Sequence, residues 1–242
     1  MKSLYTILSA GLLFGGILSR AQTIESSPVE FDEHLSDDQS PTYLDLLRLV
    51  CSDLKADKDS KSVEVVKCVP HRTFGRADNA SKWEGDSFSD PQLLPAGGPH
   101  QVMVGFNDSG ETQALAIALF DLERRPKLLE AIEISGMPDN TPSLIEKLPL
   151  TGGGTILTFT SAHTNTSLVI EQDTLVSLRD NHLESVATFS FEQCCEKDDV
   201  QHLLKVSGSA GLIQISVIED TKLRRTYRAS YQWNPARIFL SL

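Results

Sequence analysis

Residues 101–121 read QVMVGFNDSGETQALAIALFD, and this stretch decides the fold class. Two largely apolar runs, 101–106 and 113–121, flank the turn-forming cluster Asn-Asp-Ser-Gly-Glu at 107–111. Apolar runs of this length around such a cluster are typical of a β-hairpin. The stretch therefore predicts two antiparallel strands joined by a tight loop.

The rest of the chain repeats this pattern on both sides of the hairpin. We expect one strand upstream, at 63–69, and others downstream at 128–135, 155–161, 168–171, 174–178, 185–192, 203–206, 212–218 and 226–233. Alternation is clearest in the last of these, where Tyr227, Ala229, Tyr231 and Trp233 alternate with polar residues, so one face is buried and the other is wet. Residues 141–148 could form a single helical turn.

Most links between the expected strands are too short for crossover helices, which favours antiparallel pairing. The sequence therefore predicts a single mainly β domain over 41–242, an antiparallel sandwich or an up-and-down sheet or barrel of about 8–10 strands with one N-terminal helix. Blades of a small propeller would give a similar pattern. No fixed-period self-similarity supports them.

The helix is expected at 41–54, where Tyr43, Leu46, Leu47, Val50 and Leu54 recur at helical spacing. Ser40 offers an N-cap, and Pro41 suits the first turn. The preceding stretch, 22–40, holds six acids and no Lys or Arg, which predicts a flexible acidic leader that contributes nothing to the core. Residues 70–99 are rich in Gly, Pro, Asp, Asn and Ser and are expected to form a long loop.

The first 21 residues have the pattern of a cleaved signal peptide, because Lys2 precedes an apolar run over 4–18 that small residues follow. We therefore expect a secreted or periplasmic soluble protein without stable membrane insertion after cleavage. Cleavage would leave 20 Lys+Arg against 33 Asp+Glu, a net charge of −13. Nucleic acid is then not expected as a partner, because binding phosphates requires clustered Lys and Arg.

Four cysteines in an exported chain suggest disulfides. The sequence favours a local bond between Cys51 and Cys68, because a bond between the neighbours Cys194 and Cys195 would be strained. The alternative is that Cys194 and Cys195 both reach back to Cys51 and Cys68. That alternative stays open.

No motif in the chain specifies a metal or a cofactor, and we expect neither. The cluster at 107–111 lacks the first Asp and the final Glu of a calcium loop. A zinc site of Cys68, His71, Cys194, Cys195 and His202 would have irregular spacing in a compartment that favours disulfides. The run 207–211, SGSAG, lacks the first Gly of a nucleophile elbow, and no His follows His202.

The most suggestive polar cluster is Ala-His-Thr-Asn-Thr at 162–166, between two apolar strands. His163 and Asn165 could project from a loop and bind a ligand together with Trp83 from the loop at 70–99. A polar hairpin tip explains the same residues without a ligand. The favoured hypothesis is a non-catalytic module that binds a protein or glycan or serves the cell envelope. The alternative is an extracellular or periplasmic hydrolase that uses His163 with an unidentified carboxylate.

Overall fold

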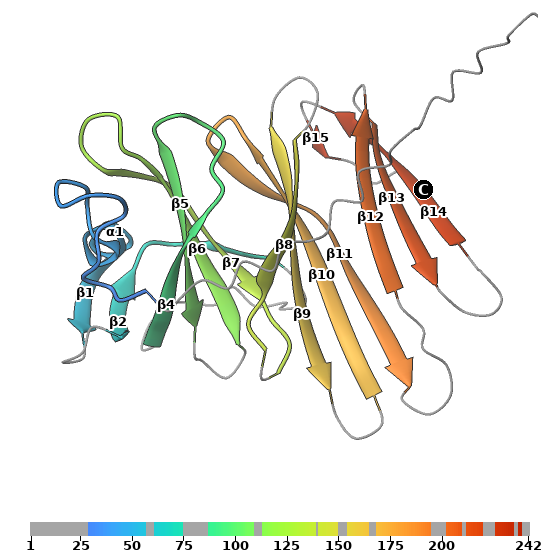
Figure 1. Ribbon diagram of the computed structural model, residues 1–242, viewed down its shortest axis with the longest axis horizontal. Coiled ribbons are helices and arrows are strands. Elements are labelled where there is room, and N and C mark those ends of the chain that lie inside the picture. Colours follow the sequence, from blue (N-terminus) through green and yellow to red (C-terminus); the bar gives the residue numbers. More distant parts are fainter. Residues whose placement is uncertain are drawn as a thin grey trace, which may run out of the picture.

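The hairpin predicted at 101–121 lies in the middle of the larger sheet in the computed structural model (Figure 1). Strands β5 (Gln101–Asp108) and β6 (Ala114–Asp121) pair antiparallel from Gln101↔Asp121 to Asp108↔Ala114. All residues of β6 but the last are buried, because both faces of this sheet are covered.

The structure describes the backbone of residues 29–56, 61–74, 87–108, 113–138, 140–149, 154–164, 168–194, 202–209, 212–219, 226–234 and 237–238. Side chains are described within these ranges up to residue 190, apart from residues 56 and 168.

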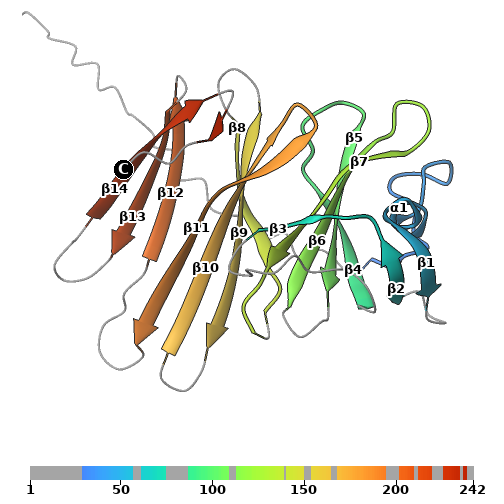
Figure 2. The ribbon, with the colours of Figure 1, turned by 180° about the vertical axis from the view of Figure 1, so that it is seen from behind.

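The hairpin belongs to a seven-stranded sheet of order β1-β2-β4-β5-β6-β7-β3. Its other members are β1 (Cys51–Ala56), β2 (Ser62–Cys68), β3 (Arg72–Phe74), β4 (Ser87–Leu94) and β7 (Lys127–Ser135). All pairs are antiparallel except β3 with β7. The chain therefore leaves β2 near one edge and crosses the sheet to reach the opposite edge as β3 (Figure 2).

The second sheet has four antiparallel strands in the order β11-β10-β9-β8. They are β8 (Ser143–Pro149), β9 (Thr155–Thr164), β10 (Leu168–Arg179) and β11 (His182–Cys194). Together the two sheets form a curled half-barrel of eleven strands, as Figure 1 shows. A separate antiparallel sheet consists of β12 (His202–Ser209), β13 (Leu212–Glu219), β14 (Thr226–Asn234) and β15 (Arg237–Ile238). The predicted mainly β class with one N-terminal helix is confirmed.

Two hydrophobic cores lie on opposite faces of the seven-stranded sheet. One contains Ala116, Ala118 and Phe120 of β6, and it is closed by helix α1 (Tyr43–Val50) and by Phe31. The other contains Leu115, Ile117 and Leu119 of β6, and it is closed by the second sheet through residues such as Phe159 and Val176. Alternate side chains of β6 therefore pack in different cores, one on each face of the sheet.

The helix is shorter than predicted, with eight residues instead of 41–54. Thr42, not Ser40, is the N-cap, and it forms a capping box with Asp45. Cys51 already has extended backbone angles and begins β1, so the residues after Val50 pair with β2 instead of continuing the helix. The described part of the chain contains no helix long and apolar enough to span a membrane.

Three further expectations differ from the structure. Residues 29–40 do contribute to the core, because Phe31 is fully buried and stacks on Phe106 with 5.9 Å between ring centroids. The predicted loop at 70–99 includes β3 and β4. Residues 143–149 form β8, an edge strand, where a helical turn was expected.

Candidate functional site

His163 lies near the end of β9, not on a loop. Its ring Nδ1 is 3.1 Å from the carbonyl oxygen of Pro138. Because a carbonyl can only accept a hydrogen bond, Nδ1 carries the proton and donates it. In the neutral ring the other nitrogen, Nε2, is then a hydrogen-bond acceptor. The pairing of β9 with β10 reaches Thr164 and Val169, and residues 165–167 between them lie outside the described residues.

The other two predicted ligand-binding residues, Asn165 and Trp83, lie outside the described residues. His163 is therefore the one member of that predicted set whose position is described.

The turn after β7 supplies the partner of His163. It begins at Gly136, whose N–H donates to the carbonyl of Gln113 at 2.8 Å. A Cβ atom at Gly136 would lie 2.1 Å from that carbonyl oxygen and 2.4 Å from the carbonyl oxygen of Asn140. Only glycine fits this close approach. The turn thereby holds the Pro138 carbonyl against β9.

A polar layer continues from His163 into the interface between the sheets. Ser161 is two residues before His163 on the same face of β9, and its register partner in β10 is Gln172. The Gln172 amide donates from Nε2 to the carbonyl of Ser135 at 2.9 Å. This bond joins the end of β7 to the second sheet.

The acids of β10 occupy the opposite face of the second sheet. Asp173 pairs with Thr160 and Glu171 with Ala162, and these positions alternate with the face that carries His163. Burial raises the pKa of Asp173, and a hydrogen bond from the Thr160 hydroxyl partly offsets this. Burial and the neighbouring Asp173 both raise the pKa of Glu171. In the described parts of β9 and β10, no carboxylate shares the face of His163.

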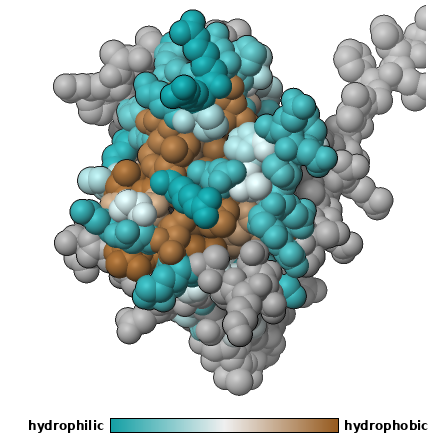
Figure 3. Space-filling view, turned by 90° about the vertical axis from the view of Figure 1, so that its left-hand side faces the viewer, coloured by the Kyte–Doolittle hydropathy of each residue, from teal (hydrophilic) through white to brown (hydrophobic). Residues whose placement is uncertain are grey.

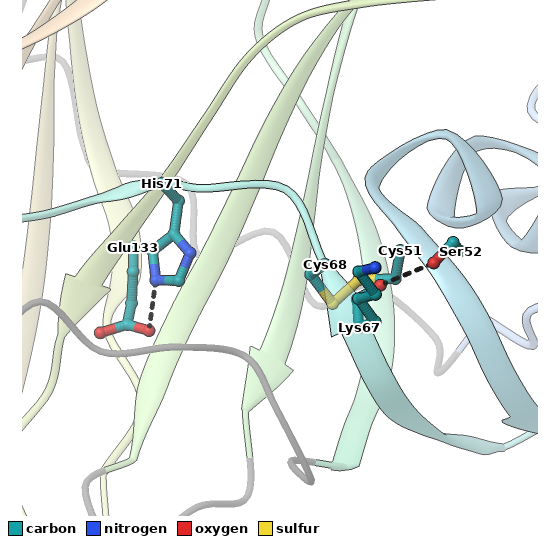
Figure 4. Close-up of a disulfide and its surroundings, with 6 residues drawn as sticks. All are labelled: Cys51, Ser52, Lys67, Cys68, His71 and Glu133. Carbon is teal, nitrogen blue, oxygen red and sulfur yellow. Dashed lines mark hydrogen bonds and ion pairs between the residues drawn. A yellow bond between two sulfur atoms is a disulfide. The ribbon is translucent and has the colours of Figure 1, made fainter.

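Two glutamates of β7 form anchors that the sequence did not reveal. Glu133 lies on the face toward α1, where His71 Nε2 is 3.5 Å from its Oε2 and the Thr73 hydroxyl is 3.4 Å from its Oε1. The His71 and Glu133 side chains are 2% and 4% exposed. Figure 4 shows the His71 ring directed at the Glu133 carboxylate.

Glu130 lies on the other face of β7, toward the second sheet. Its Oε2 accepts the backbone N–H of Leu183 at 2.6 Å and lies 2.9 Å from His182 Nδ1. The Arg72 guanidinium also contacts the Glu130 carboxylate and the Leu183 carbonyl. Asp180 and Asn181 have positive φ angles of 48° and 67°, typical of the two-residue turn that joins β10 to β11 and brings His182 to this place.

The disulfide between Cys51 and Cys68 confirms the local pairing. It joins the first register pair of β1 and β2 (Figure 4). Because Cys68 is bonded to Cys51, its thiol is not available to a zinc site with His71. Among the residues that the structure describes, no group of three His, Cys, Asp or Glu side chains could hold a metal ion.

Hydrophobic residues gather across the centre of the face that Figure 3 shows, at the end of the molecule that carries α1, β1 and β2. Leu49 of α1 and Val66 of β2 are 39% and 40% exposed. Contiguous apolar surface of this kind often marks an interaction site.

No protein-family model and no curated protein sequence matches the chain. Among solved structures, the β-propeller domain of Nup133 from Vanderwaltozyma polyspora is similar at a TM-score of 0.25 and 12% sequence identity. The match covers 60% of this chain and 47% of that domain, so the chain spans about half the length of its structural neighbour. A likeness of this size carries no information about function.

Proposed function

We propose that the protein is an exported, non-catalytic module that binds another protein. The observation that carries this proposal is the apolar surface that Figure 3 shows at the end of the molecule with α1, β1 and β2, the end where Leu49 of α1 and Val66 of β2 are exposed. An apolar surface favours a protein partner over a glycan, because protein interfaces bury apolar side chains at their centre.

The arrangement of the described polar groups also favours binding over catalysis. A hydrolase histidine is typically oriented by a carboxylate and lies beside the nucleophile or water that it deprotonates. His163 instead contacts a backbone carbonyl, and the acids of the neighbouring strand lie on the opposite face. His71 and His182 contact Glu133 and Glu130, which link separate elements of the fold. Among the residues that the structure describes, no hydrogen bond or ion pair joins His163 to a carboxylate, as the hydrolase alternative would need.

Export is part of the proposal and rests on the N-terminal sequence alone. Mass spectrometry of the protein recovered from culture medium or periplasm should give an N-terminus near residue 22. Recovery of the uncleaved chain from the cytoplasm would contradict export without affecting the binding proposal.

The test of binding uses the full chain after signal removal, immobilised and exposed to extracellular or periplasmic protein. The variant Leu49→Ser with Val66→Ser should reduce capture of a specific protein at least tenfold. Ile145→Ser is the matched control, because Ile145 is a similarly exposed apolar residue, at 46%, on the edge strand β8. It should leave capture unchanged.

A second variant replaces Trp83, His163 and Asn165 by Ala. If only this variant loses the partner, the surface at 70–99 and 162–166 is the binding site and the apolar face is not. Binding to a glycan array without specific protein capture would show that the partner class is wrong. Turnover that His163→Ala abolishes would replace the proposal with the hydrolase alternative.

A further inference from the structure

Buried oxygen atoms without hydrogen-bond partners occur where the two sheets of the half-barrel meet. Among the described residues, they include Ser161 Oγ and Gln172 Oε1. Ser161 and Gln172 are 2% and 1% exposed. Native proteins satisfy most buried polar atoms, so these two atoms call for a partner.

The two side chains are neighbours because of the strand register. Ser161 and Gln172 are directly paired in β9 and β10, and both face the seven-stranded sheet. Cβ atoms of such cross-strand pairs are about 5 Å apart. The Gln172 amide is fixed because Nε2 donates to the Ser135 carbonyl, so Oε1 must be the free end.

We propose that a hydroxyl-bearing neutral molecule binds between Ser161 and Gln172. Gln172 Oε1 can only accept, so the bound group must donate to it, while the Ser161 hydroxyl can donate to the same group. A hydroxyl does both. No charged residue shares this face in the described parts of β9 and β10, which favours a neutral molecule. The hydroxyl comes either from solvent water or from a small polyol or sugar.

His163 extends this site toward the surface. It is two residues beyond Ser161 on the same face and is only partly buried. Its Nε2 can accept a further hydrogen bond while Nδ1 holds the Pro138 carbonyl. The inference stands independently of the proposed binding function.

Nuclear magnetic resonance of the full mature chain distinguishes the two sources. Water in the site should give a nuclear Overhauser effect to the side-chain amide protons of Gln172. Glycerol or glucose in the site should instead shift those protons with a saturable dose response. If the amide protons show neither effect, the proposal is wrong.

Urea denaturation of Ser161→Ala provides a second readout. A bound hydroxyl loses a partner in this variant, so the denaturation midpoint should fall. An unbridged buried hydroxyl would be unfavourable, so its removal would raise the midpoint and contradict the proposal. Ser185→Ala, at an exposed serine of β11, is the control and should leave the midpoint within error. If Ser161→Ala does not fold, the resonance experiment on the unaltered protein still decides.

Discussion

Glu130 and Glu133 lie three residues apart on β7, and each contacts a histidine, yet their surroundings differ. Glu133 and His71 are almost fully buried beneath the segment that crosses the sheet. Glu130 is 12% exposed and its partner His182 is 52% exposed. His71, which precedes β3, and the first two residues of β3 alternate between these glutamates: His71 and Thr73 contact Glu133, while Arg72 contacts Glu130. Strand β7 therefore holds the short edge strand β3 on both faces. The contacts of Glu133 are buried, and those of Glu130 lie near solvent.

This difference predicts unequal contributions to stability. Buried polar contacts have no water to replace them, so their loss leaves groups unsatisfied. Contacts near solvent are replaced by water and are screened by salt. The substitutions below test this comparison.

Glu133→Ala should have the largest effect. It removes the acceptor beneath His71 and Thr73 and leaves their polar atoms buried without this carboxylate. We expect the free energy of unfolding to fall by about 3 kcal/mol, measured by urea denaturation. Glu133→Gln, which keeps the size and one acceptor oxygen, should lose less. Equal stability of Glu133→Ala and the unaltered protein would contradict the anchoring role of the crossing segment.

Glu130→Ala should have the second largest effect. It removes the acceptor for Arg72, His182 and the Leu183 N–H, and bonds of this kind to a charged group contribute about 2 kcal/mol. Amide hydrogen exchange should locate the loss, because the Leu183 amide should exchange faster than those of β5 and β6. Glu184→Ala is the control, since Glu184 contacts only the exposed side of His182. An unchanged exchange rate of the Leu183 amide would contradict the role of Glu130 in joining the two sheets.

Asp173 of β10 is a buried acid, and its register partner in β9, Thr160, carries no charge. Burial raises the pKa of Asp173 in the folded state above its unfolded value. Below the pKa of the unfolded state, Asp173 is protonated in both states, and its ionisation does not change the free energy of unfolding. As the pH rises from the pKa of the unfolded state through that of the folded state, the free energy of unfolding falls. Asp173→Asn should remove this decline and stabilise the protein at pH 7 by about 1 kcal/mol.

Denaturation midpoints between pH 4 and pH 8 measure the Asp173 effect. Asp180→Asn is the control, because the Asp180 side chain is exposed at the hairpin turn. If Asp173→Asn destabilises the protein at every pH, then Asp173 is charged and satisfied in the folded state.

The sequence predicted β2, β5, β6, β7, β9–β11 and β12–β14, because these strands carry their own period-two patterns or turn signals, and it missed β1, β3, β4, β8 and β15. The hairpin of β5 and β6 and the Cys51–Cys68 bond both depend on residues close in sequence. Contacts between distant residues were missed. Phe31 is buried by Phe106, and β3 is held by Glu130 and Glu133, yet each lies in a stretch whose local composition resembles a loop.

The candidate site was predicted only in part for the same reason. The Ala-His-Thr-Asn-Thr cluster did locate the link between β9 and β10, and His163 lies near the end of β9. The partner of His163 comes from a turn 25 residues earlier in the chain, which no local pattern could reveal. The alternation of His71, Arg72 and Thr73 before Phe74 was the available signal for β3. It was obscured by the Gly- and Pro-rich residues that follow.

His182→Gln should have the smallest effect and therefore sharpens the contrast with His71→Gln. His182 is half-exposed, and water can replace it beside Glu130, so we expect a loss of at most about 0.5 kcal/mol. His71→Gln changes a ring that is 2% exposed, and its loss should be several times larger because no water reaches Glu133. Both variants are compared by urea denaturation. Equal losses for the two histidines would mean that burial does not separate these anchors.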